Sequence, residues 1–294
     1  METSELLKKV RRIELKTRSM SSQVFSGEYH SAFKGRGMTF SEVREYQPGD
    51  EVRTIDWNVT ARLNHPYVKV FQEERELTAM ILVDMSASGA FGTHAQLKRE
   101  LLTEVCAVLS FSAIQNNDKA GVCFFSDSVE RFIAPRKGRG HILRIIRELV
   151  ELQPLGKGTN LESALDYCTN ALKQRCILFV LSDFMAPDAE RILRMANRRH
   201  DVVCINIFDR REQELPDAGI IQIEDPETGQ LKWVDTSDIR VRQEYARQAR
   251  MHRLRIDKMF KRCGVDATHI ATGDDYVKIL SALFHSREKR AIKR

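Results

Sequence analysis

From residue 78 onward, nearly continuous apolar runs alternate with segments of amphipathic helical character. Thr78–Val83 and Cys176–Leu181 are such runs, and they leave neither face of a strand polar enough for water. His94–Asn116 and Asn160–Leu172 place apolar residues three and four positions apart, the spacing of one helix face. Strands that are apolar on both faces need helices on both sides of the sheet. We therefore predict an α/β domain with a doubly wound, mostly parallel sheet and helices on both faces.

The two ends of the chain are expected to differ in organisation. Residues 1–75 lack the alternation, and Tyr67–Phe71 mixes aromatic and β-branched residues in the manner of a partly buried strand. We expect this amino-terminal extension to contain short strands packed on a main domain that spans residues 76–294. Within the main domain, the turn sequence Asp225–Gly229 separates two strand-like segments and predicts a hairpin insertion near residues 215–236.

Composition narrows the expected compartment and partners. The chain has 294 residues, and no apolar run approaches the roughly 20 residues that a helix needs to cross a bilayer. None of the six cysteines belongs to a CxxC pair, which favours reduced thiols over disulfides or zinc. We therefore predict a cytoplasmic protein without membrane insertion. The formal net charge of +6 could attract nucleic acid, but the basic clusters lack the interleaved aromatic residues that stack on bases.

Three short polar segments coincide with predicted element boundaries. Asp84–Ser88 follows one buried strand, Ser182–Phe184 follows another, and Gly156–Asn160 comes directly before a helix. In a doubly wound sheet, binding groups gather beyond the carboxyl ends of the strands, where the strand order reverses. If the strands that end at Asp84 and Asp183 are neighbours at that reversal, both carboxylates face one crevice.

The side chains of these segments supply carboxylate and hydroxyl oxygens. Asp84 and Asp183 provide the carboxylates, and Ser86, Ser88 and Thr159 provide the hydroxyls. Such hard oxygen ligands suit Mg²⁺, Mn²⁺ or Ca²⁺ rather than zinc. Each segment alone is also typical of a simple helix cap, but the three in this order predict a metal site built from these five residues. We find no convincing nucleophile–base pair and predict no catalytic residue.

The pattern Asp84-x-Ser86-x-Ser88, followed by Thr159 and Asp183, resembles the metal-ion-dependent adhesion site of von Willebrand factor A domains. The resemblance implies that the three hydroxyls are ligands and that the two aspartates act directly or through bound water. It also implies that an aspartate or glutamate of a protein partner takes the last coordination position. On this resemblance, the chain is expected to be a non-enzymatic interaction module with a von Willebrand A-like fold.

The segment upstream of the first buried strand supports a narrower resemblance. The runs Ser41–Asp50, Val52–Trp57, Thr60–Arg62 and Val68–Arg75 look like the signature of the bacterial domain of unknown function 58 family, and the resemblance spans roughly residues 30–240. Members of this family are similar to von Willebrand A-like proteins associated with AAA+ ATPases of the MoxR type. The resemblance therefore implies an adaptor that works beside such an ATPase in the assembly or maturation of other proteins.

Two other functions stay open at this point. A metal ion with an open coordination position can activate water, so a metal-dependent hydrolase is the main alternative. The sequence has no HExxH motif, and Gly156-Lys157 does not complete a phosphate-binding loop, because Glu151 stands where that loop needs a glycine. A nucleic-acid-binding module, which the basic termini would suggest, ranks last.

Overall fold

The computed structural model contains two compact units, Phe33–Glu76 and a larger unit that includes Leu77–Arg294. We describe each unit by itself. The residues that the structure describes are the following: 13, 38–73, 77–92, 97–156, 158–185, 189–224 and 229–292.

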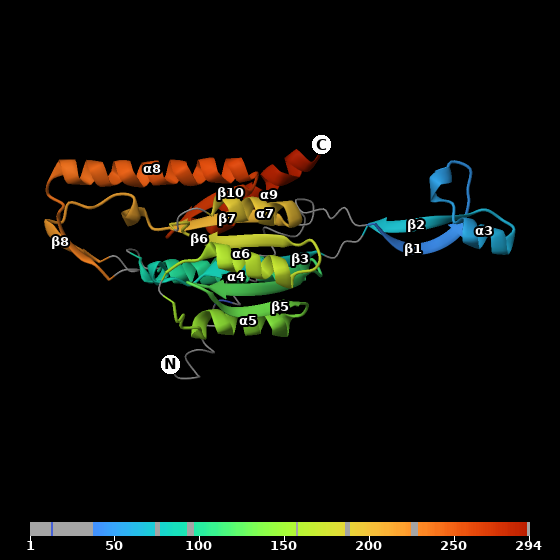
Figure 1. The fold of residues 1–294 in the computed structure, drawn as a ribbon, viewed down its shortest axis with the longest axis horizontal. Coiled ribbons are helices and arrows are strands. Elements are labelled where there is room, and N and C mark those ends of the chain that lie inside the picture. The colour runs from blue at the N-terminus through green and yellow to red at the C-terminus, as the bar shows by residue number, and fades with distance from the viewer. Residues whose placement is uncertain are drawn as a thin grey trace. The chain divides into compact units, whose positions relative to one another are not determined.

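A six-stranded sheet forms the centre of the larger unit (Figure 1). Its strands are β3 (Thr78–Asp84), β4 (Lys119–Phe125), β5 (Val129–Arg136), β6 (Ile177–Ser182), β7 (Asp201–Phe208) and β10 (Asp266–Ala271). They lie in the order β10-β7-β6-β3-β4-β5, and every neighbouring pair is parallel except β4 with the edge strand β5. The short turn between β4 and β5 explains this exception, because a tight connection can join only antiparallel strands.

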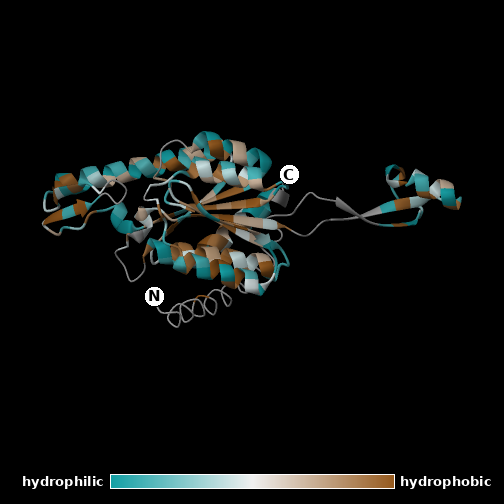
Figure 2. Ribbon diagram, turned by 60° about the horizontal axis from the view of Figure 1, so that its bottom comes forward, coloured by the Kyte–Doolittle hydropathy of each residue, from teal (hydrophilic) through white to brown (hydrophobic). Residues whose placement is uncertain are grey.

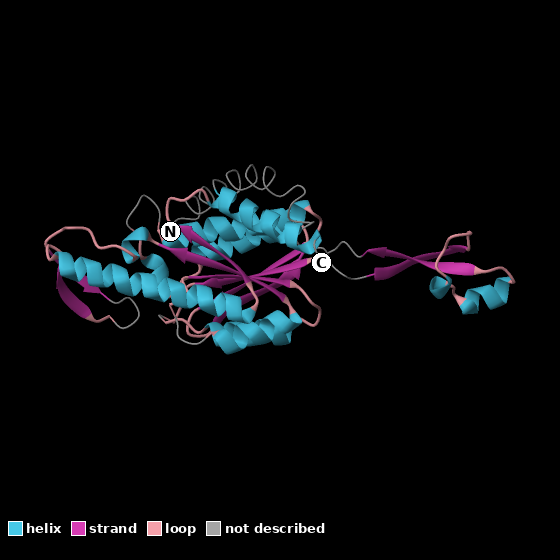
Figure 3. Ribbon diagram, turned by 90° about the horizontal axis from the view of Figure 1, so that it is seen from above, coloured by secondary structure: helices cyan, strands magenta, loops and turns pink. Residues whose placement is uncertain are grey.

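Helices cover both faces of this sheet (Figure 3). They are α4 (Lys98–Gln115), α5 (Arg139–Glu151), α6 (Leu161–Ala171), α7 (Glu190–Arg199), α8 (Ile239–Cys263) and α9 (Tyr276–Ile292). On one face, α6, α7 and α8 pack on the side chains of Leu82 and Val180 in a single buried cluster. On the other face, α4 packs on α5, and Phe284 of α9 meets Phe179 of β6 ring edge to ring face. The predicted doubly wound, mostly parallel α/β fold is confirmed.

The continuous apolar runs are strands whose two faces are both covered. In β3, residues Ala79–Val83 are all 0% exposed, so successive side chains enter the two helical layers in turn. Figure 2 shows these strands as the hydrophobic centre of the larger unit, while hydrophilic residues colour the outer surfaces of the helices. Burial of each of the larger apolar side chains in these runs contributes about 1.5–3 kcal/mol to the stability of the fold.

Between β7 and α8, the chain forms a separate antiparallel hairpin. It consists of β8 (Ile220–Glu224) and β9 (Leu231–Asp235), the region where the sequence predicts a hairpin. Its two strands pair only with each other, so the hairpin lies outside the six-stranded sheet. In the described part of the chain, no helix has both the length and the hydropathy needed to cross a membrane.

The smaller unit is a two-stranded antiparallel sheet with a short helix. β1 (Met38–Glu45) pairs with β2 (Tyr67–Glu73), and η1 (Val52–Thr54) and α3 (Trp57–Leu63) lie between them in the chain. The amino-terminal extension therefore contains the strands that the sequence predicts. The helix α3 was not predicted from the sequence. Its cap is Asp56, whose Oδ1 accepts hydrogen bonds from the backbone N–H groups of Asn58 and Val59. The predicted packing of this extension on the main domain stays a prediction.

Candidate metal centre

Asp84 and Asp183 lie at the carboxyl ends of neighbouring parallel strands. β3 ends at Asp84, and β6 ends at Ser182, one residue before Asp183. The two strands pair with each other, and the strand order reverses between them, because β4 lies beyond β3 on one side and β7 beyond β6 on the other. Both aspartates are therefore at the reversal of the sheet, where the fold leaves a crevice.

The carboxylate of Asp84 is buried and held by two hydrogen bonds. Asp84 is 4% exposed. Its Oδ1 accepts a hydrogen bond from the backbone N–H of Ser86 (3.0 Å), and its Oδ2 accepts one from the hydroxyl of Ser182 (2.6 Å). Burial first, and then the charge of Asp183, raise the pKa of Asp84 to about 6, although the hydrogen bonds oppose this shift. A cation bound nearby would relieve both unfavourable effects.

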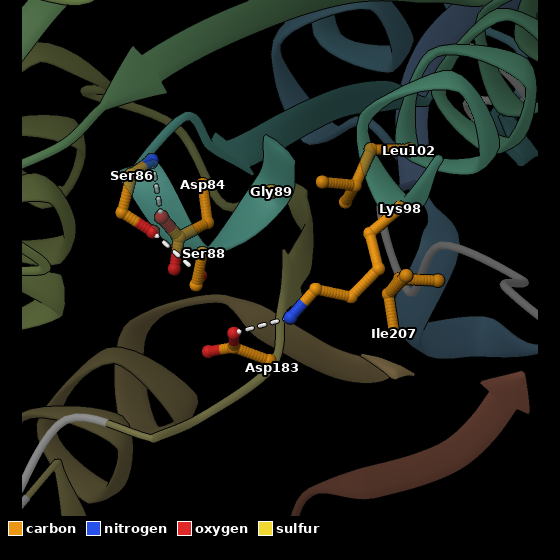
Figure 4. A pocket seen from close by; sticks show the side chains of 8 residues that line it. All are labelled: Asp84, Ser86, Ser88, Gly89, Lys98, Leu102, Asp183 and Ile207. Atoms are coloured by element: carbon orange, nitrogen blue, oxygen red, sulfur yellow. Dashed lines mark hydrogen bonds and ion pairs between the residues drawn. The ribbon is translucent and has the colours of Figure 1, made fainter. Parts of the chain in front are cut away.

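The two serine hydroxyls lie beside this carboxylate (Figure 4). Ser86 Oγ and Ser88 Oγ are 3.1 Å apart, and both residues line the same pocket as Asp84. The short helix η2 (Ala87–Ala90) begins directly after Ser86 and bends the chain, so that Ser88 turns back toward Ser86. The end of β3 and the loop after it thus present three oxygen-bearing side chains to one small volume.

The carboxylate of Asp183 is held by a backbone group and by a lysine. Its Oδ1 accepts a hydrogen bond from the backbone N–H of Met185 (3.2 Å). Its Oδ2 lies 3.0 Å from the ammonium nitrogen of Lys98, which lies 2.6 Å from Oε1 of Glu212. Burial alone would lower the pKa of Lys98, but the charges of Asp183 and Glu212 outweigh burial, so the net pKa is raised and the ammonium stays charged.

Sequence reasoning did not identify Lys98 or Glu212 as part of this site. For Lys98, the helical spacing could have indicated burial. Lys98 precedes Leu101, Leu102 and Val105 by three, four and seven positions, so it lies on the same buried face of α4. A lysine on such a stripe needs an anionic partner inside the protein. Glu212 offered no comparable signal, because it belongs to the short helix η3 (Arg210–Glu212) and is partly exposed.

Thr159 is the one predicted ligand that does not line the pocket formed by the other four. It is half-buried in the loop before α6. That loop is fixed on the β4–β5 turn: the N–H of Asn160 donates to the carbonyl of Ser126 (2.8 Å), and Glu130 accepts from the N–H of Gly156 (3.0 Å). Asn160 caps α6 by accepting from the N–H of Ser163 (3.0 Å), the capping role that its sequence position indicates. The structure therefore brings together four of the five predicted residues.

The pocket fits a small divalent cation in size, ligand chemistry and charge. Its lining includes Asp84, Ser86, Ser88 and Asp183, and its cavity of about 10 Å³ has room for about one water-sized sphere. Among the described residues, the carboxylates of Asp84 and Asp183 line the pocket together with one ammonium, that of Lys98, which Glu212 also contacts. Hard carboxylate and hydroxyl oxygens suit Mg²⁺ or Mn²⁺. The described residues contain no group of three or more His, Cys, Asp or Glu side chains arranged to hold a metal, so a site here depends on the serine hydroxyls.

Comparisons with known proteins place this chain among uncharacterised bacterial relatives. Residues 42–255 match the family described as "Protein of unknown function DUF58". The uncharacterised protein Rv1480 of Mycobacterium tuberculosis is 31% identical over 286 residues, which cover 96% of this chain and 90% of the relative. The uncharacterised protein YeaD of Bacillus subtilis is 31% identical over 110 residues, 37% of this chain and 25% of the relative.

Solved structures show more distant likenesses. The protein BatB of Bacteroides thetaiotaomicron aligns with a TM-score of 0.49 at 15% identity, over 72% of this chain and 99% of that one. The SpRpn10 VWA domain aligns with a TM-score of 0.40 at 13% identity, over 72% of this chain and 95% of that one.

Proposed function

The chain belongs to the family described as protein of unknown function DUF58, and we propose that it is a non-catalytic protein-interaction module whose site binds a divalent metal ion. One observation carries the proposal. Asp84, Ser86, Ser88 and Asp183 come from two neighbouring strand ends and line one pocket of ionic size. The resemblance of these residues, with Thr159, to a metal-ion-dependent adhesion site supports the same reading.

In this proposal, the protein's oxygens hold the ion, and a partner completes its coordination. Ser86 and Ser88 offer hydroxyl ligands, and Asp84 and Asp183 offer carboxylates directly or through water. Thr159 would join them from the loop before α6. The bound ion supplies a positive charge that attracts an aspartate or glutamate of the partner protein. The hydrogen bonds from Ser86 and Ser182 keep the Asp84 carboxylate oriented for this role.

The pocket favours binding over catalysis. A cavity of about 10 Å³ has room for one small ion, and the carboxylate of a partner would have to reach that ion from outside the cavity. The described residues that line it include no histidine, the side chain that most often serves as a general base. A non-enzymatic adaptor is therefore the function that we propose.

The partner that we propose is an AAA+ ATPase of the MoxR type. This part of the proposal rests on the family resemblance of the upstream segment, together with a site that would attract a carboxylate. An adaptor of this kind would present the ATPase to proteins that it assembles or matures.

The test measures binding between the purified chain and a purified MoxR-type ATPase from the same organism. We expect binding in Mg²⁺ that falls at least tenfold in EDTA, and a similar loss in Mg²⁺ for the double variant Ser86→Ala/Ser88→Ala. The variant Ser237→Ala, which removes an exposed hydroxyl outside the pocket, is the control and should bind like the wild type. Equal binding by all proteins, with and without EDTA, would rule out a metal-dependent contact.

A further inference from the structure

Lys98 brings a fixed positive charge into the candidate metal centre. Its side chain is 2% exposed although it carries a charge, and it reaches from α4 into the pocket that Asp84, Ser86 and Ser88 line (Figure 4). A buried ammonium is stable only when carboxylates compensate for its lost hydration. Two carboxylates do so here, and one of them, Asp183, is itself a proposed metal ligand.

Both oxygens of Asp183 are already engaged. The backbone N–H of Met185 donates to Oδ1, and Lys98 donates to Oδ2 from 3.0 Å. A divalent ion bound to this carboxylate would come close to the ammonium, and two cations in a poorly solvated pocket repel each other strongly. The ion and Lys98 therefore cannot both make their best contacts with Asp183.

Glu212 gives the ammonium a second anionic contact. Its Oε1 lies 2.6 Å from the ammonium nitrogen of Lys98, whereas Oδ2 of Asp183 lies 3.0 Å from that nitrogen. Its Oε2 accepts a hydrogen bond from the backbone N–H of Asp209 (2.9 Å), which holds the Glu212 side chain in place. Lys98 can thus keep its ion pair with Glu212 when a metal ion binds Asp183.

We propose that Lys98 is an internal competitor of the divalent ion for Asp183 and that it sets the metal affinity of the site, with Glu212 as the residue that holds the ammonium when the ion binds. This inference rests on the proposed metal site and goes beyond it. It adds a control element, because the site loads only at metal concentrations high enough to displace the Lys98–Asp183 contact.

The test is the dissociation constant for Mn²⁺, measured from free Mn²⁺ by electron paramagnetic resonance and from metal-dependent thermal shifts. Lys98→Met keeps the length of the side chain but removes its charge, and we expect it to bind Mn²⁺ at least about tenfold more tightly than the wild type. Glu212→Gln should have the opposite effect and weaken binding about threefold or more, because the ammonium then pairs with Asp183 alone. Arg211→Met is the matched control: it removes an exposed positive charge next to Glu212 in the chain and should change the affinity less than about twofold.

Each outcome decides between the inference and the metal site on which it rests. Tighter binding by Lys98→Met, with an unchanged Arg211→Met, supports the inference, also where the wild type binds too weakly to measure. Mn²⁺ binding that depends on Asp84 but is unaffected or weakened in Lys98→Met overturns the inference and leaves the metal site standing. No binding by either protein overturns both. Where Lys98→Met does not fold, Glu212→Gln decides: weaker binding supports competition, and unchanged or tighter binding contradicts it.

Discussion

At the scale of single residues, the chemistry of this chain depends on charged groups that the fold holds away from water. Asp84 is buried beside a second carboxylate, and Lys98 is buried between two. Such groups remain charged only because specific neighbours compensate for lost hydration. His200 is a simpler case in the same unit. It is fully buried, and its pKa is lowered by burial and by nearby arginines.

We predict that His200 makes the stability depend on pH between about 4 and about 6.5. Burial first, then the charges of Arg199 and Arg175, lowers the pKa of His200 to about 4, so the folded protein keeps this ring neutral where the unfolded chain protonates it. The free energy of unfolding should therefore fall as the pH drops through this range. Between pH 7.5 and pH 4.5, the loss from His200 should be about 2–3 kcal/mol.

Urea unfolding of the wild type and of His200→Asn at these two pH values checks this prediction. The asparagine does not titrate, so the stability advantage of the wild type over the variant should shrink at pH 4.5 by the predicted amount. An advantage of the same size at both pH values would show that His200 does not titrate as predicted.

The motif residues could be read from the sequence because each stands at the end of a strongly patterned segment. Asp84 and Asp183 follow continuous apolar runs, and the reversal of strand order places the ends of those runs side by side. Lys98 and Glu212 could not be assigned in this way, because their contact joins residues 114 positions apart. That contact depends on how the fold places α4 next to η3 at the crevice, and no local sequence pattern predicts this placement.

At the scale of elements, pattern and connection length account for most of the sheet. Alternating apolar runs and amphipathic helices predicted the parallel strands, and the tight turn at Ser126–Ser128 explains why β4 and β5 form the antiparallel pair. The helix α3 was missed because it is too short to show a period and owes its start to the cap by Asp56. The edge pair β4–β5 also contains a feature without any apolar signal: a glycine opposite a proline.

We predict that Gly121→Ala destabilises the larger unit by about 2 kcal/mol or more. A Cβ at position 121 would lie 2.8 Å from the carbonyl oxygen of Ile133 and 2.8 Å from the nitrogen of Pro135, both of them backbone atoms of β5. The ladder has a register shift at this point, and relief of the overlap would separate the two strands.

Chemical denaturation compares this variant with Gly140→Ala. A Cβ at position 140, in the first turn of α5, would meet no atom within 4 Å, so this control should change the stability by less than about 1 kcal/mol. Similar stabilities for the two variants would contradict the role that we give to the close approach of β5.

At the scale of the whole molecule, the hydrophobic core and the candidate metal centre belong to the same unit. All but one of the buried hydrophobic side chains of the described residues lie at or beyond Ala79, and the exception is Val68 of the smaller unit. A change in the pocket should therefore alter the free energy of unfolding of the larger unit, because the pocket lies at the ends of its central strands. Metal binding to the folded state alone would raise the free energy of unfolding.

The most direct test of the account is a thermal-unfolding series in EDTA, Mg²⁺, Mn²⁺ and Ca²⁺. It compares the wild type with Asp84→Asn/Asp183→Asn, which preserves side-chain shape, and with the exposed control Asp166→Asn. At a metal concentration 100 times the dissociation constant, the wild type and the control should gain about 2.7 kcal/mol, and the double variant should gain nothing. A gain of the same size in the double variant, or no gain at any metal concentration in either the wild type or Lys98→Met, would contradict a metal site at Asp84 and Asp183.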